Sequence, residues 1–198
     1  MSKLVVATRN KGKLNEITSI LASLNMEVVS VLEFPSAPEV EETGSTLEEN
    51  AFIKAQSVFD ATGLPSLADD TGLEVHSLDM HPGVRSARYA GEAVTYADNN
   101  RKLLEALRGK TGRERRAQFR CVAAFVADDC KKSAEGICAG SIIDDPRGSG
   151  GFGYDPLFVP DGYSKTFAEL PADIKNQISH RALAFKAMLH ILTKYFRE

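Results

Sequence analysis

The sequence predicts an α/β protein built on a mixed β-sheet flanked by helices. The chain opens with an apolar strand, a short polar loop, an amphipathic helix and a second strand, an order that indicates a parallel unit. Near the middle of the chain, apolar residues occupy every second position over 117–127 while Gln118 and Arg120 start the other face, as in a strand, and a partner strand follows after a short turn. The chain closes with apolar residues at helical spacing.

The first elements form the parallel unit. A buried strand is expected at 4–7, a helix at 13–24 and a second strand at 26–32. The helix is predicted because its apolar residues share one face. These residues are Leu14, Ile17, Ile20, Leu21 and Leu24. A loop rich in Pro and Glu is expected over 33–44.

The second helix is predicted from its two ends. Ser45 or Thr46 caps its start, and Glu48 or Glu49 is the capping-box partner three residues later. Because glycine favours the position after a helix, the helix is expected to stop at Gly63.

The centre of the chain is expected to contain short strands and a third helix. Strands around 66–68 and 73–76 flank an acidic turn at 69–72, which reads Asp-Asp-Thr-Gly. The third helix covers 95–107 and ends near Gly109.

The last part of the chain returns to a hairpin and ends in a helix. A turn at 128–132 connects the strand at 117–127 to a partner at 133–143. A cluster of glycines over 148–153 predicts a loop. The final helix is expected over 179–196.

Composition indicates an ordinary globular protein. The chain has 198 residues, of which 43% are hydrophobic and 26% charged, values that suit one domain or one domain with two lobes. No apolar run approaches the roughly 20 residues of a membrane helix, and the N-terminus lacks the pattern of a signal peptide. We therefore expect a cytoplasmic protein with no membrane partner.

Charge argues against a nucleic-acid partner. The net charge is −3, whereas a broad nucleic-acid surface is usually basic. One basic run departs from this average, and it is interpreted as a solvated turn and strand start; it contains Arg108, Lys110, Arg113, Arg115, Arg116 and Arg120. The three cysteines match neither a zinc motif nor a disulfide framework, and Cys121 is expected to fill the core.

The first candidate site is the loop between the opening strand and helix. A helix N-terminus attracts anions, and a lysine in the first turn adds a positive charge. This loop is not a Walker A motif, and by itself it indicates phosphate binding only weakly. Its residues are Thr8, Arg9, Asn10, Lys11, Gly12 and Lys13.

The second candidate is a set of carboxylates. Glu41 and Glu42 precede the second helix, and Asp69 and Asp70 follow a strand. Mg²⁺ binds oxygen ligands, typically one or two carboxylates together with water and substrate phosphate. Turn and cap chemistry would also explain these residues. The Asp-Thr-Gly triplet occurs in aspartic proteases, but this chain has neither a second copy nor an all-β pattern.

The third candidate lies near the C-terminus. Glycines over 150–153 let the backbone approach a ligand, and Phe152 offers a ring on which a base can stack. Asp155 can accept hydrogen bonds, and His180 and Arg181 are donors suited to purine carbonyl oxygens. The alternative for the glycine segment is a hairpin with inward-facing aromatics. The alternatives for His180 and Arg181 are a solvent-facing residue in the first turn of a helix and an ordinary surface charge.

Taken together, these segments resemble the inosine/xanthosine triphosphate pyrophosphatase family. The resemblance runs from Ala7 to about Lys186 in the order and spacing of that family. The segments that carry it are A-T-R-N-K-G-K, V-E-E-T-G-S-T-L-E-E-N-A-F-I-K-A, L-A-D-D-T-G-L, P-G-V-R-S-A-R-Y-A-G-E, G-S-G-G-F-G-Y-D-P-L-F and I-S-H-R.

The resemblance implies roles for individual residues. The triphosphate would be held by Thr8, Asn10, Lys13 and Lys54, with Thr71 beside the substrate. Mg²⁺ would be held by Asp70, which is also the catalytic carboxylate, and by Glu41 or its neighbour Glu42, with Glu41 favoured. The base would be bound by Phe152, Gly153, Tyr154, Asp155, Lys175, His180 and Arg181.

The resemblance also implies a fold, an assembly and a reaction. The fold would be an elongated mixed sheet in two lobes with a central cleft, forming one domain over 1–198 with no separable linker, and the assembly a homodimer. The enzyme would cleave ITP, dITP and XTP to a monophosphate and pyrophosphate, and so remove non-standard purine nucleotides from the precursor pool. The alternatives are a phosphatase that releases the terminal phosphate and a purine-nucleotide-binding module that does not hydrolyse.

Two positions depart from the family pattern. Arg9 stands where many members have glycine, which bears on the geometry of the phosphate loop, although its guanidinium could also neutralise phosphate. Thr71 stands where many have serine, and it keeps the hydroxyl.

Overall fold

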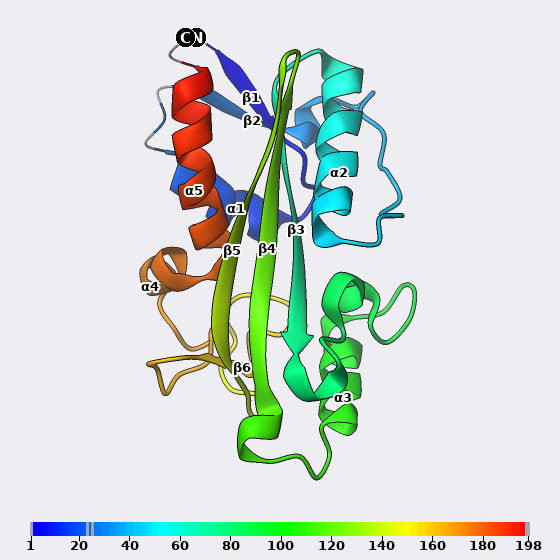
Figure 1. The fold of residues 1–198 in the computed structure, drawn as a ribbon, viewed down its shortest axis with the longest axis vertical. Helices are drawn as coiled ribbons and strands as arrows, with labels where there is room; N and C mark the ends of the chain where they lie inside the picture. Colours follow the sequence, from blue (N-terminus) through cyan, green and yellow to red (C-terminus); the bar gives the residue numbers. More distant parts are fainter. Residues whose placement is uncertain (1, 23, 25, 197–198) are drawn as a thin grey trace. The chain divides into compact units, whose positions relative to one another are not determined.

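The computed structural model describes residues 2–22, 24 and 26–196, and it confirms an α/β protein with a mixed sheet. Six strands form one sheet in the order β2-β1-β3-β4-β5-β6 (Figure 1). Strand β1 (Lys3–Val6) pairs in parallel with β2 (Glu27–Ser30) and with β3 (Ser66–Val75), whereas β5 (Cys130–Ile142) pairs antiparallel with β6 (Phe158–Pro160). The parallel opening predicted from the sequence is therefore present.

The helices follow the predicted order, with one addition. They are α1 (Lys11–Leu21), α2 (Leu47–Thr62), α3 (Tyr96–Ala106), α4 (Ala172–Ile178) and α5 (His180–Tyr195). The sequence did not predict α4, a short helix that begins directly after Pro171. In the predicted first helix, Ser23 lies outside the described residues. None of the helices in the described part of the chain is long and apolar enough to cross a membrane.

The predicted caps of α2 are confirmed. Thr46 and Glu49 form a reciprocal capping box, in which each side chain accepts from the backbone of the other. At the C-terminal end, Gly63 adopts a left-handed conformation with φ 67°, which glycine accommodates without steric cost. Both ends of the helix are therefore fixed by residues readable in the sequence.

The acidic turn predicted at 69–72 is wrong, because β3 runs through it without interruption. Asp and Gly are depleted in strands, and this depletion suggested a turn. In the structure, ion pairs stabilise the buried carboxylates, and Gly72 is required because a Cβ there would lie 2.5 Å from the carbonyl oxygen of Gly83. The turn predicted at 128–132 is likewise shorter, since β4 (Arg116–Ala127) and β5 are separated only by Asp128 and Asp129.

The residues group into two compact units, each assembled from separate segments. Unit 1 contains Met1–Asp70, Cys121–Gly136 and His180–Glu198, and unit 2 contains Thr71–Arg120 and Ile137–Ser179. The boundaries fall inside β3, β4 and β5 and directly before α5. The expected cleft between two lobes stays a prediction.

Each unit has its own hydrophobic core. In unit 1, α1 and α5 lie against each other (Figure 1). Their buried apolar side chains form one core with those of β1, β3 and β4. Cys121 lies in this core, as predicted. In unit 2, Phe119, Phe158 and Phe167 contact one another, with ring centroids between 4.8 and 5.9 Å apart.

The basic run in unit 2 is only partly a solvated surface. Arg115 is buried, and its guanidinium donates to the carbonyl oxygens of Leu107, Ile142 and Ile143 at 3.2, 2.7 and 2.9 Å. It therefore fixes the C-terminal cap of α3 to the end of β5. Arg116 forms an ion pair with Asp161 instead.

Replacing Arg115 with Leu is expected to destabilise the protein by about 1–3 kcal/mol or more, because buried carbonyl oxygens lose their donors. The free energy of unfolding, measured by denaturant titration, provides the test. Arg113→Leu is the matched control, since Arg113 is exposed in the same run and should change stability by about 0.5 kcal/mol or less. Equal effects of the two substitutions would contradict the assigned role.

Candidate active site

The loop between β1 and α1 is fixed by its own side chains. The side-chain oxygen of Asn10 caps α1 by accepting from the backbone N–H of Lys13 at 3.1 Å, and Thr8 Oγ1 accepts from the N–H of Asn10 at 3.3 Å. Arg9 Nη2 donates to the carbonyl oxygen of Ala37 at 2.9 Å. Arg9 therefore connects the loop to the segment before α2. In this chain, the residue that stands in place of the family's usual glycine helps to fix the phosphate loop.

Asp69 is the centre of a buried charge cluster in unit 1. Its side chain is fully buried, and its Oδ2 lies 3.1 Å from Lys13 Nζ and 3.2 Å from Arg181 Nη2. Burial alone would raise the pKa of Asp69, but the charges of Lys13, Arg181 and Lys54 outweigh burial and hold it far below its usual value. Asp69 therefore stays ionised and is a poor proton acceptor.

Arg181 connects this cluster to α1. The residue is 1% exposed, and its Nη1 donates to Glu16 Oε2 at 2.5 Å while Nε and Nη2 donate to Asp69. A buried guanidinium between two carboxylates satisfies the requirement that buried charges be paired. The guanidinium of Arg181 therefore forms ion pairs with two carboxylates of unit 1, Glu16 and Asp69.

Asp70 is the centre of a second cluster in unit 1. Lys54 Nζ lies 2.7 Å from Asp70 Oδ1 and 2.8 Å from Glu42 Oε1, so one ammonium group holds two carboxylates. The pKa of Asp70 is raised, because burial and the negative charge of Glu42 outweigh the charges of Lys54 and Lys13. A carboxylate with a raised pKa is suited to accept a proton.

Adjacent residues of β3 supply both clusters because side chains alternate along a strand. Asp69 contacts Lys13 and Arg181, which belong to α1 and α5, whereas Asp70 contacts Lys54 of α2. In Figure 1, α5 lies to the left of the β3 strand and α2 to its right. The Asp-Asp pair therefore consists of two carboxylates with different partners and different chemistry.

The two glutamates before α2 differ in burial and in contacts. Glu42 is half-buried and shares Lys54 with Asp70, whereas Glu41, favoured from the sequence, is exposed. The geometry thus favours Glu42 as the partner of Asp70 in binding a cation.

Glu42 and Asp70 suit a hard divalent cation. Their carboxylates already converge on a single positive charge, that of Lys54. The described residues contain no group of three or more His, Cys, Asp or Glu side chains that could form a closed metal site. Mg²⁺ commonly binds through one or two carboxylates, with water and substrate phosphate completing its shell, so the pair fits this ion.

Unit 2 contains the predicted aromatic cluster. Lys175 Nζ lies 2.6 Å from the buried Asp155 and 5.1 Å from the centroid of the Phe152 ring, which is half-buried. The backbone N–H of Phe152 donates to the same Asp155 oxygen at 2.9 Å. Tyr96 at the start of α3 lies 6.3 Å from Phe152 between ring centroids. An aromatic face, a cation and a carboxylate are therefore adjacent.

The remaining predicted site residues are distributed as follows. Gly153 accepts from Asn100 through its carbonyl oxygen, and Tyr154 is buried, its hydroxyl donating to the carbonyl oxygen of Ser86 at 2.9 Å. Thr71 lies in β3, at the start of unit 2. His180 is buried as the first residue of α5, in unit 1.

Three residues that contact these clusters were not predicted. Glu16 lies three residues after Lys13, and Asn50 lies four residues before Lys54, so each shares a helix face with a predicted lysine. That spacing could have found them. Tyr96 gave no signal beyond being an aromatic residue after a capping threonine.

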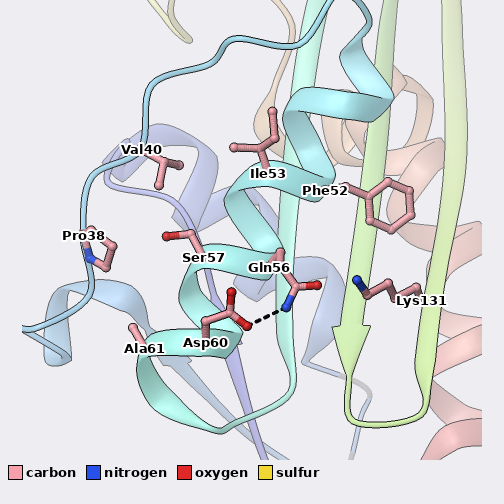
Figure 2. Close-up of a pocket in the computed structure, with 9 residues that line it drawn as sticks. All are labelled: Pro38, Val40, Phe52, Ile53, Gln56, Ser57, Asp60, Ala61 and Lys131. Atoms are coloured by element: carbon pink, nitrogen blue, oxygen red, sulfur yellow. Dashed lines mark hydrogen bonds between the residues drawn. The ribbon is translucent and has the colours of Figure 1, made fainter.

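A pocket of about 850 Å³ lies elsewhere on unit 1, along α2 (Figure 2). Pro38, Val40, Phe52 and Ile53 supply its apolar surface, and a hydrogen bond joins Gln56 to Asp60 at its edge. None of the predicted site residues lines it. The candidate active site is therefore the pair of charge clusters on β3.

Comparison with known proteins places this arrangement in a family. A model of the Ham1 family matches residues 4–191. The chain belongs to the Ham1 family. Relatives of this Ham1 chain include a protein from Geobacter sulfurreducens named dITP/XTP pyrophosphatase, 52% identical over 93% of both chains. One of the same name from Desulforamulus reducens is 48% identical over 98% of this chain and 97% of the relative.

Solved structures support the same family. The Ham1 protein of Coxiella burnetii is 43% identical and similar in structure with a TM-score of 0.89, covering 98% of this chain and 100% of that protein. A nucleoside-triphosphatase or dITP/XTP pyrophosphatase from Mycobacterium abscessus is 42% identical with a TM-score of 0.76, covering 94% and 98%. The predicted family and fold class are confirmed.

Proposed function

We propose that this Ham1 protein is a Mg²⁺-dependent pyrophosphatase that cleaves dITP, XTP and ITP to the monophosphate and pyrophosphate. The observation that carries the proposal is the cluster of Asp70, Glu42 and Lys54, in which a carboxyl with a raised pKa lies beside a lysine and a second carboxylate. The names of the near full-length relatives support the substrate class.

The residues of unit 1 suit the triphosphate. Lys13 and Lys54 provide the positive charges that orient phosphate groups for in-line attack, and the N-terminus of α1, capped by Asn10, adds backbone N–H groups. Mg²⁺, when bound by Glu42 and Asp70, would neutralise charge on the phosphate oxygens. Glu42 replaces Glu41 in this proposal because of its contact with Lys54.

Asp70 and Asp69 have different roles in the proposed reaction. Asp70, whose carboxylate lies beside Lys54 and Glu42, accepts the proton of the attacking water. Asp69 keeps its negative charge and holds Lys13 and Arg181 in place. The α-phosphate is then attacked, and pyrophosphate leaves.

The residues of unit 2 suit the base. A purine can stack on Phe152, and the Lys175 ammonium beside it favours a carbonyl oxygen such as O6 of hypoxanthine or xanthine. The exocyclic amine of adenine would face this cation with its own hydrogens, and a buried donor would be left unpaired. Base recognition in our proposal depends on Phe152, Asp155 and Lys175, since Arg181 is bound to Asp69 and Glu16.

The biological role that follows is removal of non-standard purine nucleotides from the precursor pool. We further propose a cytoplasmic homodimer that binds neither nucleic acid nor membrane. Light scattering in solution would test the dimer, for which a mass twice that of the single chain is expected, and a mass equal to one chain would overturn it.

The base preference and metal requirement are tested together. Pyrophosphate release is measured with ITP, XTP, dITP, ATP and GTP, each with Mg²⁺ and with excess chelator. We expect release from ITP, XTP and dITP to exceed that from ATP by about 10²-fold or more, as for a site whose polar groups reject the wrong base, and to stop with chelator. Equal rates with ATP and ITP would overturn the specificity. Tight binding of ITP without any turnover would favour a nucleotide-binding module instead.

A further inference from the structure

The side chain of Asn50 lies between the two parts of the proposed metal site. Asn50 is fully buried in the first turn and a half of α2, one helical turn before Lys54. Its Oδ1 accepts from the backbone N–H of Gly44 at 2.7 Å, and its Nδ2 donates to Asp70 Oδ2 at 3.4 Å. One amide group therefore contacts both the loop that carries Glu42 and the strand that carries Asp70.

Hydrogen-bond chemistry fixes the orientation of this amide. A backbone N–H can only donate, so the oxygen of Asn50 must face Gly44. The nitrogen then faces Asp70, whose ionised carboxylate can only accept. Neither aspartate nor leucine at position 50 could make both bonds.

Gly44 allows the loop to come this close. A Cβ at position 44 would lie 2.6 Å from Asn50 Oδ1 and 2.7 Å from Glu49 Cβ, distances that require atoms to move. The loop thus approaches the helix through a residue without a side chain. Because Glu42 lies two residues earlier, its position depends on this contact.

We propose that Asn50 is a positioning residue that sets the spacing of Glu42 and Asp70 for the divalent cation. This inference rests on the proposed Mg²⁺-dependent function. Lys54 holds the two carboxylates by charge, whereas Asn50 holds the loop backbone at Gly44 and one carboxylate oxygen of Asp70 by directional hydrogen bonds. Groups that orient metal-binding carboxylates in this way typically change metal affinity or activity by about 10–100-fold when they are removed.

The test measures Mg²⁺ affinity by calorimetry, without substrate, and steady-state hydrolysis of ITP over a range of Mg²⁺ concentrations. Asn50→Leu removes both hydrogen bonds at nearly constant volume, and Asn50→Asp keeps only the acceptor. Glu49→Ala is the matched control, because Glu49 fixes the same loop through Ser45 and Thr46 at the adjacent position of the helix. Thermal unfolding tests whether each variant is folded at the assay temperature.

We expect Asn50→Leu to weaken Mg²⁺ binding by about 10–100-fold and to lower kcat at a given Mg²⁺ concentration, with the KM for ITP changed by less than about threefold. Glu49→Ala should leave Mg²⁺ affinity within about threefold of wild type. If Asn50→Leu does not fold, Gly44→Ala is the second variant, and it should shift Mg²⁺ affinity in the same direction.

A structural readout is independent of the metal. The side-chain amide signals of Asn50 in a ¹⁵N-labelled sample, identified by their loss in Asn50→Asp, should shift in Asp70→Asn, because the Nδ2 group loses its charged acceptor. Wild-type Mg²⁺ affinity in Asn50→Leu, or unshifted amide signals in Asp70→Asn, would overturn the inference. Failure of the wild-type protein to hydrolyse ITP in the presence of Mg²⁺ would overturn the proposed function, and the inference with it.

Discussion

Replacing Asp70 with Asn is expected to reduce pyrophosphate release from ITP by about 10²–10⁴-fold, the contribution of a positioned general base. The same substitution should change the stability of the protein little, because two effects oppose each other. The neutral amide removes the cost of burying a carboxylate, which raises the pKa of Asp70, but it also removes one of the two carboxylates that hold the buried Lys54 ammonium.

Activity and stability are measured on the same sample, by a pyrophosphate-release assay and by thermal unfolding. Loss of activity with an unchanged or higher unfolding temperature identifies a residue retained for function. Activity within about tenfold of wild type would show that Asp70 is not the general base. A large fall in unfolding temperature would show that Asp70 also stabilises the fold through its ion pair with Lys54.

Replacing Arg181 with Met is expected to destabilise the protein by about 3–5 kcal/mol, because it removes one partner of a buried ion pair and leaves Asp69 with fewer positive charges around it. In a chain of this length the unfolding temperature should fall by about 6–20 °C. Arg101→Met is the control, since the Arg101–Asp98 pair is exposed and should be worth about 1 kcal/mol or less.

The acid side of the stability profile gives a second measure of the same contact. The pKa of Asp69 is depressed in the folded state, so its contribution to stability is present above the unfolded pKa near 3.9 and is lost as the pH falls below that value. Without Arg181 the folded pKa rises, and both the size of the contribution and its loss in acid should diminish. Equal destabilisation by Arg181→Met and Arg101→Met would contradict the cluster.

The sequence predicted elements that have local signals. The Thr46 and Glu49 capping box and Gly63 defined α2 because capping depends on neighbouring residues alone. The continuous strand through Asp69 and Asp70 could not be predicted in the same way. Its carboxylates are stabilised by Lys13, Lys54 and Arg181, which are distant in the sequence.

In the candidate site, too, some features could be predicted from the sequence and others depended on tertiary packing. Asp70 and Lys54, predicted from the resemblance to the family, lie in contact. The choice between Glu41 and Glu42 depended on which way two adjacent side chains point from an irregular loop, and no periodicity governs such a loop. Arg181, interpreted from the sequence as a donor to the base, is enclosed by Asp69 and Glu16, and only tertiary packing could show this.

The position of bond cleavage tests the central proposal most directly. Products of ITP hydrolysis in ¹⁸O-labelled water are followed by ³¹P NMR. Our account predicts inosine monophosphate that carries the ¹⁸O label, together with unlabelled pyrophosphate, because water attacks the α-phosphate. Inosine diphosphate with orthophosphate, or label in the pyrophosphate, would contradict it.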